Sequence, residues 1–445
     1  MTVNNLFEPT RCIGSIEARA EAEKLRNGIS TARSRPVSYY IDLLDAVGKL
    51  WSDPTFRASV LPFLATATGH SPELVELELD TVCKFLKQEY LFAMVDRELE
   101  DGNILDNWIK VQGILLRRHP RGLILHNLAG NALIVAPLSI TFGLLTKNIA
   151  LIKVPSDQPL FSTAFVRSLL SLAPELNNEI SVLQWSGSDH EVFQTLFPVL
   201  DGAIHWGGEK SQHAISLLAS EYDVPLLSHG PKFSFSYIDG LMQKDVTELA
   251  KRISIDIVLW EQKACSSPRF ILVRSGDDGA DAQALAESLA ISLSQADVKW
   301  PVSRTDIGKS ILVAAQRQQY SLKYGMSGQG KVLASKDPNG WTVVISNTLP
   351  DNAAINASTG RFIFVCPVSS STEVLNYLKS YDRQQRKLLQ VMAYEGKDMN
   401  FLDAATYLGV SRISRIGEMS FPAPGASHDG GYNLSALTTI HSCPE

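Results

Sequence analysis

The stretch that decides the fold is LILHNLAGNALIVAPLSITFGLLTKNIALIKV, residues 123–154. It opens with a short apolar run that ends in a glycine-containing loop. It continues with an apolar segment of helical length and closes on a second short run rich in isoleucine and leucine. Two such runs flanking a helical segment are typical of parallel strands joined by a crossover helix. Residues 123–154 therefore predict a βαβ unit.

The same alternation continues as far as residue 230. Helical patterns over 160–172 and 190–200 each precede an apolar run, and the second of these runs ends in Gly207 and Gly208. We expect a doubly wound parallel sheet, which binds ligands at the carboxyl ends of its strands. No GxGxxG fingerprint is present. The glycine pair precedes a helix, where free N–H groups would accept a pyrophosphate, but such a pair is also common in plain turns.

A single cysteine draws attention in the stretch IVLWEQKACSSPRF, residues 257–270. Cys265 follows an apolar segment and precedes Ser266 and Ser267, with Pro268 and Arg269 after them. A nucleophilic sulfur must be reachable by substrate, and free N–H groups in a loop stabilise both a thiolate and a substrate oxyanion. The alternative is a buried cysteine that acts only as a small apolar side chain.

The remaining chain predicts a second α/β unit and two appendages. Strands are expected at 267–275, 341–347 and 360–368, with helices at 280–295 and 372–392. The expected organisation is a cofactor-binding domain from 1–107 and 126–230, a β-hairpin arm at 108–125 with its turn at 117–120, a catalytic domain at 231–420 and a loop-like tail at 421–445. The tail holds His428 and Asp429, which suggest acid–base chemistry, although adjacent residues do not easily face each other.

Composition excludes several classes of function. The chain has 445 residues, 45% of them hydrophobic, and a net charge of −6 with scattered lysines and arginines, so nucleic acid is not an expected partner. Its five cysteines show neither a disulfide framework nor metal-ligand spacing, and the N-terminus shows no export signal, so we expect a cytoplasmic protein without a metal. The uncharged stretch 122–146 contains polar and helix-breaking residues, which favour a globular core over a membrane span.

Read together, Asn131, the strand ending in Lys153, the Gly207-Gly208 pair and the Cys265 loop resemble the aldehyde dehydrogenase superfamily in order and spacing. More narrowly, HNLAGN, LIKVPSDQP, WEQKACSSPR and the terminal HDG resemble the long-chain acyl-CoA reductases of the LuxC type. The resemblance implies an aldehyde dehydrogenase-like α/β fold in which Cys265 attacks the acyl carbon and Asn131 holds the oxyanion. It also implies that Lys153 binds the adenine ribose of a nicotinamide cofactor and that the hairpin arm mediates self-association.

Three positions depart from the superfamily pattern. Ser156 stands where NAD-using members often carry a ribose-binding glutamate, and a hydroxyl beside a lysine would accept a 2′-phosphate, so NADPH is the expected cofactor. Ser228 stands where oxidising members carry the glutamate that activates water, so hydrolysis of a thioester should be slow. Ile363 stands where a second family glutamate is expected. Glu261, four residues before Cys265, would either serve as a local base or simply face solvent. The second of these interpretations is favoured.

The expected function is NADPH-dependent reduction of a fatty acyl-CoA, or another acyl thioester, to the aldehyde through a Cys265 thioester. An acyl-transferring or acyl-activating protein is a possible partner, and the chain is expected to form a homo-oligomer. Two alternatives stay open. One is a cofactor-independent cysteine acyltransferase or thioesterase with His229 or His205 as base, and the other is a non-catalytic scaffold for an acyl-transferring partner.

Overall fold

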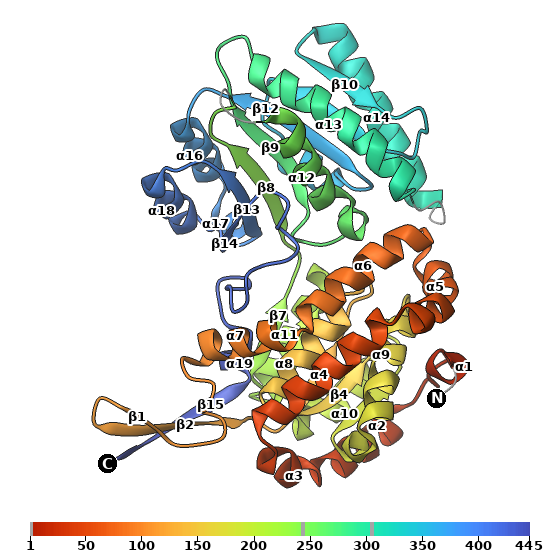
Figure 1. Cartoon of the computed structure of the whole chain (residues 1–445), viewed down its shortest axis with the longest axis vertical. Helices are drawn as coiled ribbons and strands as arrows, with labels where there is room; N and C mark the ends of the chain where they lie inside the picture. The colour runs from red at the N-terminus through yellow and green to blue at the C-terminus, as the bar shows by residue number, and fades with distance from the viewer. Residues whose placement is uncertain (1–2, 242–244, 303–306) are drawn as a thin grey trace.

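Two sheets organise the chain, one in each half of the molecule as drawn in Figure 1. The computed structural model describes residues 3–241, 245–302 and 307–445. The lower half in the view contains a five-stranded sheet and the upper half a seven-stranded sheet. Within the described ranges, no helix combines the length and the apolar character needed to cross a bilayer.

The five-stranded sheet is entirely parallel and has the order β5-β4-β3-β6-β7. Its strands are β3 (Leu123–Asn127), β4 (Ile149–Lys153), β5 (Ile180–Leu183), β6 (Gly202–Trp206) and β7 (Leu226–His229). The strand order reverses between β3 and β6, which confirms the doubly wound sheet and its βαβ unit. A crevice for ligands is expected at the carboxyl ends of these two strands.

Helices cover both faces of this sheet, which explains why β3, β4 and β6 are buried along their whole length. Alternate residues of β3 point to opposite faces: Leu123 and Leu125 join one core cluster, and Ile124 joins another. The first cluster involves α2 (Ser15–Arg26), α10 (His190–Leu196) and α11 (Glu209–Glu221). The second involves α4 (Val37–Ser52), α8 (Val135–Leu145) and α9 (Pro159–Leu172).

The front of the chain is helical, as expected. Its other helices are α1 (Val3–Leu6), α3 (Ile29–Ser34), α5 (Pro54–Thr68), α6 (Pro72–Phe85) and α7 (Gln88–Leu99). Ser71 caps α6, because its side chain accepts a hydrogen bond from the Leu74 N–H. The uncharged stretch 122–146 forms β3, a loop and α8, so it lies in the globular core.

The seven-stranded sheet has the order β10-β11-β12-β9-β8-β13-β14 and is parallel except at β10. Its strands are β8 (Phe233–Ile238), β9 (Pro268–Arg274), β10 (Gly330–Ala334), β11 (Thr342–Ser346), β12 (Phe362–Val368), β13 (Leu389–Glu395) and β14 (Arg412–Ser414). Its helices are α12 (Val246–Val258), α13 (Ala280–Lys299), α14 (Ile307–Ser327), α15 (Asn352–Ala357) and α18 (Met399–Tyr407). Short 3₁₀ turns are η1 (Pro174–Asn178), η2 (Phe197–Val199) and η3 (Leu259–Gln262).

The prediction of one long helix at 372–392 is wrong. The segment instead forms α16 (Ser371–Ser380), α17 (Arg383–Arg386) and then β13. Asp382 caps a new short helix, α17, with a capping box. The apolar residues of β13 that follow are buried in the sheet. Tertiary burial therefore overrides the helical spacing of the apolar positions.

The arm also differs from expectation. Its strands are β1 (Ile109–Val111), β2 (Ile114–Pro120) and β15 (Thr438–Pro444), and they extend from the lower half in Figure 1. The turn lies at Gln112 and Gly113, both with positive φ, whereas 117–120 belongs to β2. The five-stranded sheet begins at Leu123, ahead of the expected boundary at 126. The tail is not merely loop-like, because it also forms α19 (Asn433–Ala436) and β15, which pairs with β2.

Candidate active site

A cavity of about 730 Å³ lies between the two sheets. The carboxyl ends of β3, β4, β6 and β7 line one side of it, and residues next to the amino ends of β9, β13 and β14 line the other. Six residues that the sequence predicts for catalysis or cofactor binding border this one cavity: Asn131, Lys153, Ser156, Gly207, Gly208 and Cys265.

Cys265 occupies a turn between η3 and β9. The Ser267 N–H donates to the Ala264 carbonyl across the turn, at 3.1 Å. The carbonyl of Cys265 accepts a hydrogen bond from Ser234 Oγ at 2.8 Å, which ties the turn to β8. Ser266 Oγ lies 3.0 Å from Ser420 Oγ, which joins the turn to the segment ahead of the tail. Cys265 therefore lies in a loop with a defined conformation, as thiolate chemistry requires.

The segment ahead of Cys265 adopts an unusual backbone. Trp260, Glu261 and Gln262 have φ of 62°, 52° and 55°, a left-handed conformation that costs a non-glycine residue about 1–2 kcal/mol. The Gln262 amide holds this conformation, because its Nε2 donates to the carbonyls of Pro268 and Phe362 at 2.7 and 2.9 Å. Its Oε1 accepts from the Phe362 N–H at 3.0 Å.

Glu261 does not face solvent, so the favoured reading of this residue is wrong. It is 4% exposed and pairs with the guanidinium of the fully buried Arg361. Since the carboxylate is committed to this ion pair, it is not available as a base. Glu261 thus stabilises the Cys265 loop through a buried ion pair with Arg361.

The surroundings of Cys265 disfavour its thiolate in this state. Burial raises the pKa of the Cys265 thiol, and the nearby carboxylate of Asp429 raises it further. A hydrogen bond with the Gln390 side chain and the charge of Arg412 act in the opposite direction. Because the net shift is upward, a nucleophilic role for this thiol would require a group that removes its proton.

Asn131 lies beside the nucleophile loop. Its Nδ2 donates to the carbonyl of Lys263, two residues before Cys265, at 3.2 Å. The side chain is exposed to the cavity, so the amide can turn toward a substrate oxygen. An amide donor and the N–H of a turn are the groups that stabilise an oxyanion without forming an ion pair.

The other side of the cavity has the features of a dinucleotide site. Gly208 precedes α11 and offers no side-chain cap, so the first-turn N–H groups remain available to an anion. A Cβ on Gly207 would lie 2.5 Å from Ser211 Oγ, so the close approach there requires glycine. Lys153 ends β4, and burial lowers the pKa of its ammonium while Asp157 opposes that shift. These residues fit a nicotinamide dinucleotide with its pyrophosphate at α11.

Ser228, the expected counterpart of the family's water-activating glutamate, does not line the cavity. Its Oγ is buried without a hydrogen-bond partner among the described residues. The next residue, His229, lines the cavity instead, because successive side chains of β7 point to opposite sides. His229 and not Ser228 is therefore the residue of β7 that borders the same cavity as Cys265.

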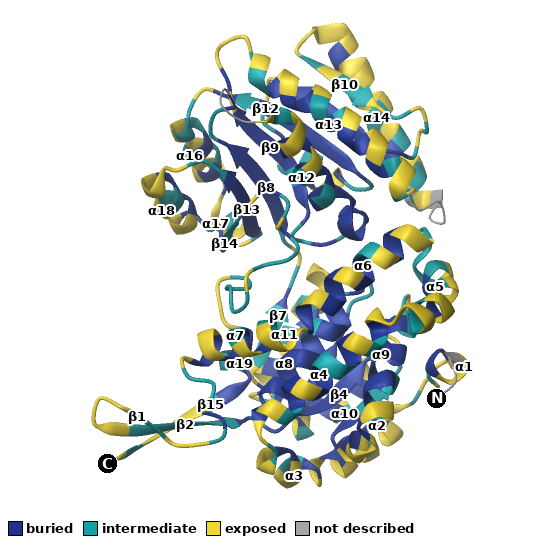
Figure 2. Cartoon of the chain, viewed as in Figure 1, coloured by how far each residue is buried: buried dark blue, intermediate teal, exposed yellow. Residues whose placement is uncertain are grey.

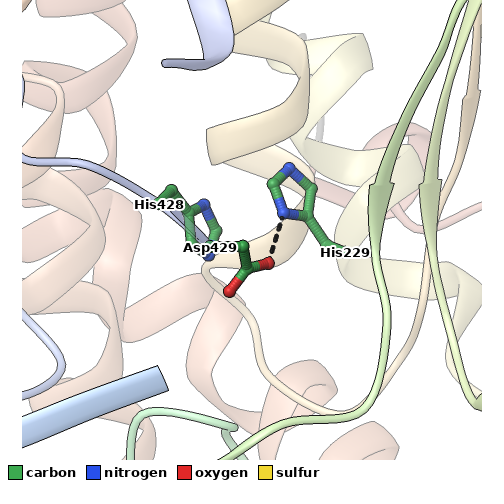
Figure 3. A group of neighbouring side chains, drawn as sticks. All are labelled: His229, His428 and Asp429. Atoms are coloured by element: carbon green, nitrogen blue, oxygen red, sulfur yellow. Dashed lines mark hydrogen bonds and ion pairs between the residues drawn. The ribbon is translucent and has the colours of Figure 1, made fainter. Parts of the chain in front are cut away.

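Figure 3 shows that His229, His428 and Asp429 form one cluster, although 200 residues separate β7 from the tail. His229 Nδ1 lies 2.9 Å from Asp429 Oδ2, and the His229 ring stacks on His428 at 4.3 Å. Burial lowers the pKa of His428 to about 3, so this ring is neutral. Burial opposes ionisation of Asp429, but the His229 hydrogen bond and the neighbouring His428 lower its pKa overall.

His205, the other histidine considered as a base, has both ring nitrogens occupied. Its Nδ1 lies 2.9 Å from Asn127 Nδ2, and its Nε2 lies 3.2 Å from Ser211 Oγ. Burial lowers its pKa to about 4. It is a structural histidine that fixes the loops after β3 and β6.

These features define an aldehyde dehydrogenase-like α/β fold, with Cys265 at a cavity between its two sheets. Lactaldehyde dehydrogenase from Escherichia coli superposes with a TM-score of 0.70 at 14% identity, covering 97% of this chain and 92% of that one. A family model described as Acyl-CoA reductase (LuxC) matches residues 32–440. The chain therefore belongs to the acyl-CoA reductase (LuxC) family and is an acyl thioester reductase.

Two relatives carry the name long-chain acyl-protein thioester reductase. The protein from Vibrio harveyi is 26% identical over 413 residues, which cover 91% of this chain and 82% of the relative. The protein from Aliivibrio fischeri is 24% identical over 410 residues, which cover 90% and 81% of the two chains. The similarity thus extends over both sheets and the cavity between them.

Proposed function

We propose that this protein reduces long-chain acyl thioesters to aldehydes with NADPH, through a thioester on Cys265. The observation that carries the proposal is the meeting of Cys265 and Asn131 with Lys153 and the Gly207-Gly208 loop in one cavity. The first pair supplies a nucleophile and an oxyanion donor, and the second supplies a cation and free N–H groups for a dinucleotide. A covalent acyl intermediate and a reductant would therefore share one enclosed space.

Cys265 attacks the acyl carbon, and the Asn131 amide and the Cys265 N–H stabilise the oxyanion that forms. When bound, the cofactor supplies the hydride that converts the acyl group into the aldehyde. Of the described residues that line the cavity, the carboxylates are Glu98 and Asp157. Glu98 accepts a hydrogen bond from the Leu434 N–H at 2.7 Å, and Asp157 lies beside Ser156. Neither carboxylate belongs to the Cys265 loop, so we expect slow hydrolysis of the thioester.

The preference for NADPH rests on Ser156. Its side chain is exposed to the cavity three residues after Lys153, where a 2′-phosphate would meet a hydroxyl and a cation rather than a carboxylate. Asp157 is directed elsewhere, because a Cβ on Gly130 would lie 2.8 Å from its Oδ1. The carboxylate therefore lies against the loop after β3, and the Ser156 hydroxyl, which donates a long hydrogen bond of 3.5 Å to the Trp185 carbonyl, lies at the cavity.

The preference for a long acyl chain rests on the apolar wall of the cavity. Its side chains come mainly from α6, α7 and α8: Phe85, Tyr90, Met94, Val135, Leu138 and Phe142. Burying each methylene of a chain against such a wall contributes about 0.8 kcal/mol. Longer chains should therefore bind more tightly until the cavity is full.

The test is a panel of acyl-CoA thioesters of increasing chain length and a long-chain acyl protein, each with NADPH or NADH. Nicotinamide absorbance and aldehyde are followed, with Cys265→Ala as control. We expect NADPH oxidation that requires both thioester and Cys265, and the better donor identifies acyl-CoA or acyl protein as the substrate. Thioester cleavage without NADPH oxidation would support the acyltransferase or thioesterase alternative. Full activity of Cys265→Ala would refute the mechanism.

We also propose that the arm joins copies of the chain. Figure 2 shows extensive exposed surface on the arm, and its exposed apolar residues are Trp108, Val111, Ile114 and Ile440. A contact between arms would remove this apolar surface from water. Light scattering of the protein and of an Ile114→Glu/Ile440→Glu variant tests this: an oligomer that becomes a monomer is expected. If the substrate is an acyl group bound to a protein, we propose that an acyl-activating protein carries this group and delivers it to the enzyme.

A further inference from the structure

His229 combines features that the reduction mechanism above does not use. It is 5% exposed and lines the same cavity as Cys265. Its Nδ1 is held by Asp429, whereas its Nε2 is buried and has no hydrogen-bond partner among the described residues. The ring packs against Trp206, at 4.1 Å, and against His428, at 4.3 Å, and these two neighbours also contact each other at 5.6 Å, so three rings hold one another in place. An oriented imidazole whose Nε2 has no hydrogen-bond partner among the described residues thus borders the cavity.

The same carboxylate also connects to the nucleophile. Gln390 Nε2 donates to Asp429 Oδ1 at 2.7 Å, while Asp429 Oδ2 accepts from His229. The Gln390 side chain also acts on Cys265, because it lowers the pKa of the thiol. Asp429 therefore sets the positions of two side chains that line the same cavity as Cys265, the Gln390 amide and the His229 imidazole.

His229, His428 and Asp429 lie close enough together to suggest a metal site, but the ring geometry argues against one. The two imidazole planes are stacked at an interplanar angle of 17°. Because the lone pairs of an imidazole lie in the ring plane, stacked rings do not direct them at a common point. The cluster is better suited to holding and moving a proton.

We propose that His229, oriented by Asp429, is the acid and base of the acyl-transfer half-reaction, an inference that rests on the proposed function. Nε2 accepts the Cys265 proton as the bond from Sγ to the acyl carbon forms. When the bond from that carbon to the donor sulfur breaks, Nε2 returns the proton to the donor sulfur. One thiol is consumed and one is released, so this half-reaction needs no cofactor and no external proton.

The test uses His229→Asn in the full-length protein, because an asparagine amide can replace Nδ1 as the donor to Asp429 while Nε2 is lost. His213→Asn, an exposed histidine of α11 outside the cavity, is the matched control. Acylation of Cys265 without cofactor is followed by intact mass and rapid quench, with two donors. One donor is tetradecanoyl-CoA, whose alkyl thiolate is a poor leaving group and must be protonated as it leaves. The other is the S-phenyl thioester of the same fatty acid, whose aryl thiolate is a good leaving group and needs no proton.

We expect His229→Asn to acylate about 10²–10³-fold more slowly from the CoA ester and only about tenfold more slowly from the thiophenyl ester. An equal loss with both donors would overturn the proposed proton return to the donor sulfur, and a rate within about threefold of wild type would refute the inference outright. If His229→Asn does not fold, Asp429→Asn takes its place. This variant should acylate Cys265 at least about tenfold more slowly, again with the larger loss for the CoA ester. If wild-type protein never acylates Cys265, the proposed function itself fails, and the two failures are thereby distinguished.

Discussion

Arg361 and Glu261 form a buried ion pair, with Arg361 Nη2 2.5 Å from Glu261 Oε1 across 100 residues of chain. A second carboxylate, that of Asp297, lies 2.5 Å from Nη1 of the same guanidinium. Arg361 stands at the entry to β12 and Glu261 stands four residues before Cys265. The pair therefore connects the nucleophile loop to the sheet behind it.

Replacing Arg361 by methionine should destabilise the protein by about 3–5 kcal/mol, because Glu261 would be left as a buried charge without its partner. Chemical denaturation measures this loss. The control is Lys331→Met, which removes the half-exposed pair with Glu287 and should cost far less stability. Similar losses in both variants would show that the Arg361 pair does not support the loop.

Replacing Asn131 by alanine should lower kcat/KM by about 10²–10³-fold, because one oxyanion donor is lost. Steady-state kinetics with the preferred thioester provides the measurement. Asn177→Ala, in the exposed turn η1, is the matched control and should stay within about twofold of wild type. An Asn131→Ala enzyme with wild-type kcat/KM would remove Asn131 from the mechanism.

Replacing Ser156 by glutamate should lower kcat/KM for NADPH by about 100-fold and change that for NADH by less than about tenfold. The reason is that a carboxylate beside a 2′-phosphate costs several kcal/mol of like-charge repulsion. Ser171→Glu, on the exposed side of α9, controls for the added charge. Unchanged NADPH kinetics in the Ser156 variant would place the 2′-phosphate elsewhere.

Replacing Glu98 by glutamine should change how stability depends on pH. Burial raises the pKa of Glu98 to about 7, against 4.5 for an unperturbed carboxyl. Because the folded-state pKa is raised, its stabilising contribution is complete below about pH 4.5 and is lost as the pH rises through about 7. Glu98→Gln should therefore gain up to about 3 kcal/mol relative to wild type between pH 5 and pH 8.

The measurement is denaturation of both proteins across that pH range. The quantity of interest is the difference between the two proteins, because burial also raises the pKa of Asp256 to about 7 in each of them. A difference that stays constant from pH 5 to pH 8 would contradict the assignment of Glu98 as a carboxyl that is protonated in the folded state.

Sequence reasoning, together with the family resemblance, predicted those candidate site residues that lie near local patterns. Asn131, Lys153 and Gly208 follow apolar runs at the ends of β3, β4 and β6, and parallel strands bring such ends together. Cys265 was recognised from its loop composition. In each case the spacing of apolar residues, or a residue typical of turns, lay within a few positions of the candidate side chain.

The remaining features depend on contacts that no local pattern reveals. His229 and Asp429 meet across 200 residues, and Gln390 was assigned to a helix that proved to be a strand. Alternation along β7 could have identified His229, because either Ser228 or His229 had to face the cavity. The left-handed conformation of Trp260 to Gln262 has no sequence signal, since it is stabilised by Phe362, Pro268 and the buried Arg361.

The most direct test of the central claim is a single-turnover experiment. The protein is mixed with tetradecanoyl-CoA in the absence of cofactor, its intact mass and peptides are recorded, and NADPH is then added. We predict a tetradecanoyl group on Cys265 that survives in water and is discharged as tetradecanal when NADPH is supplied. An acyl group that never forms on Cys265, or one that leaves as the free acid before NADPH arrives, would contradict the account.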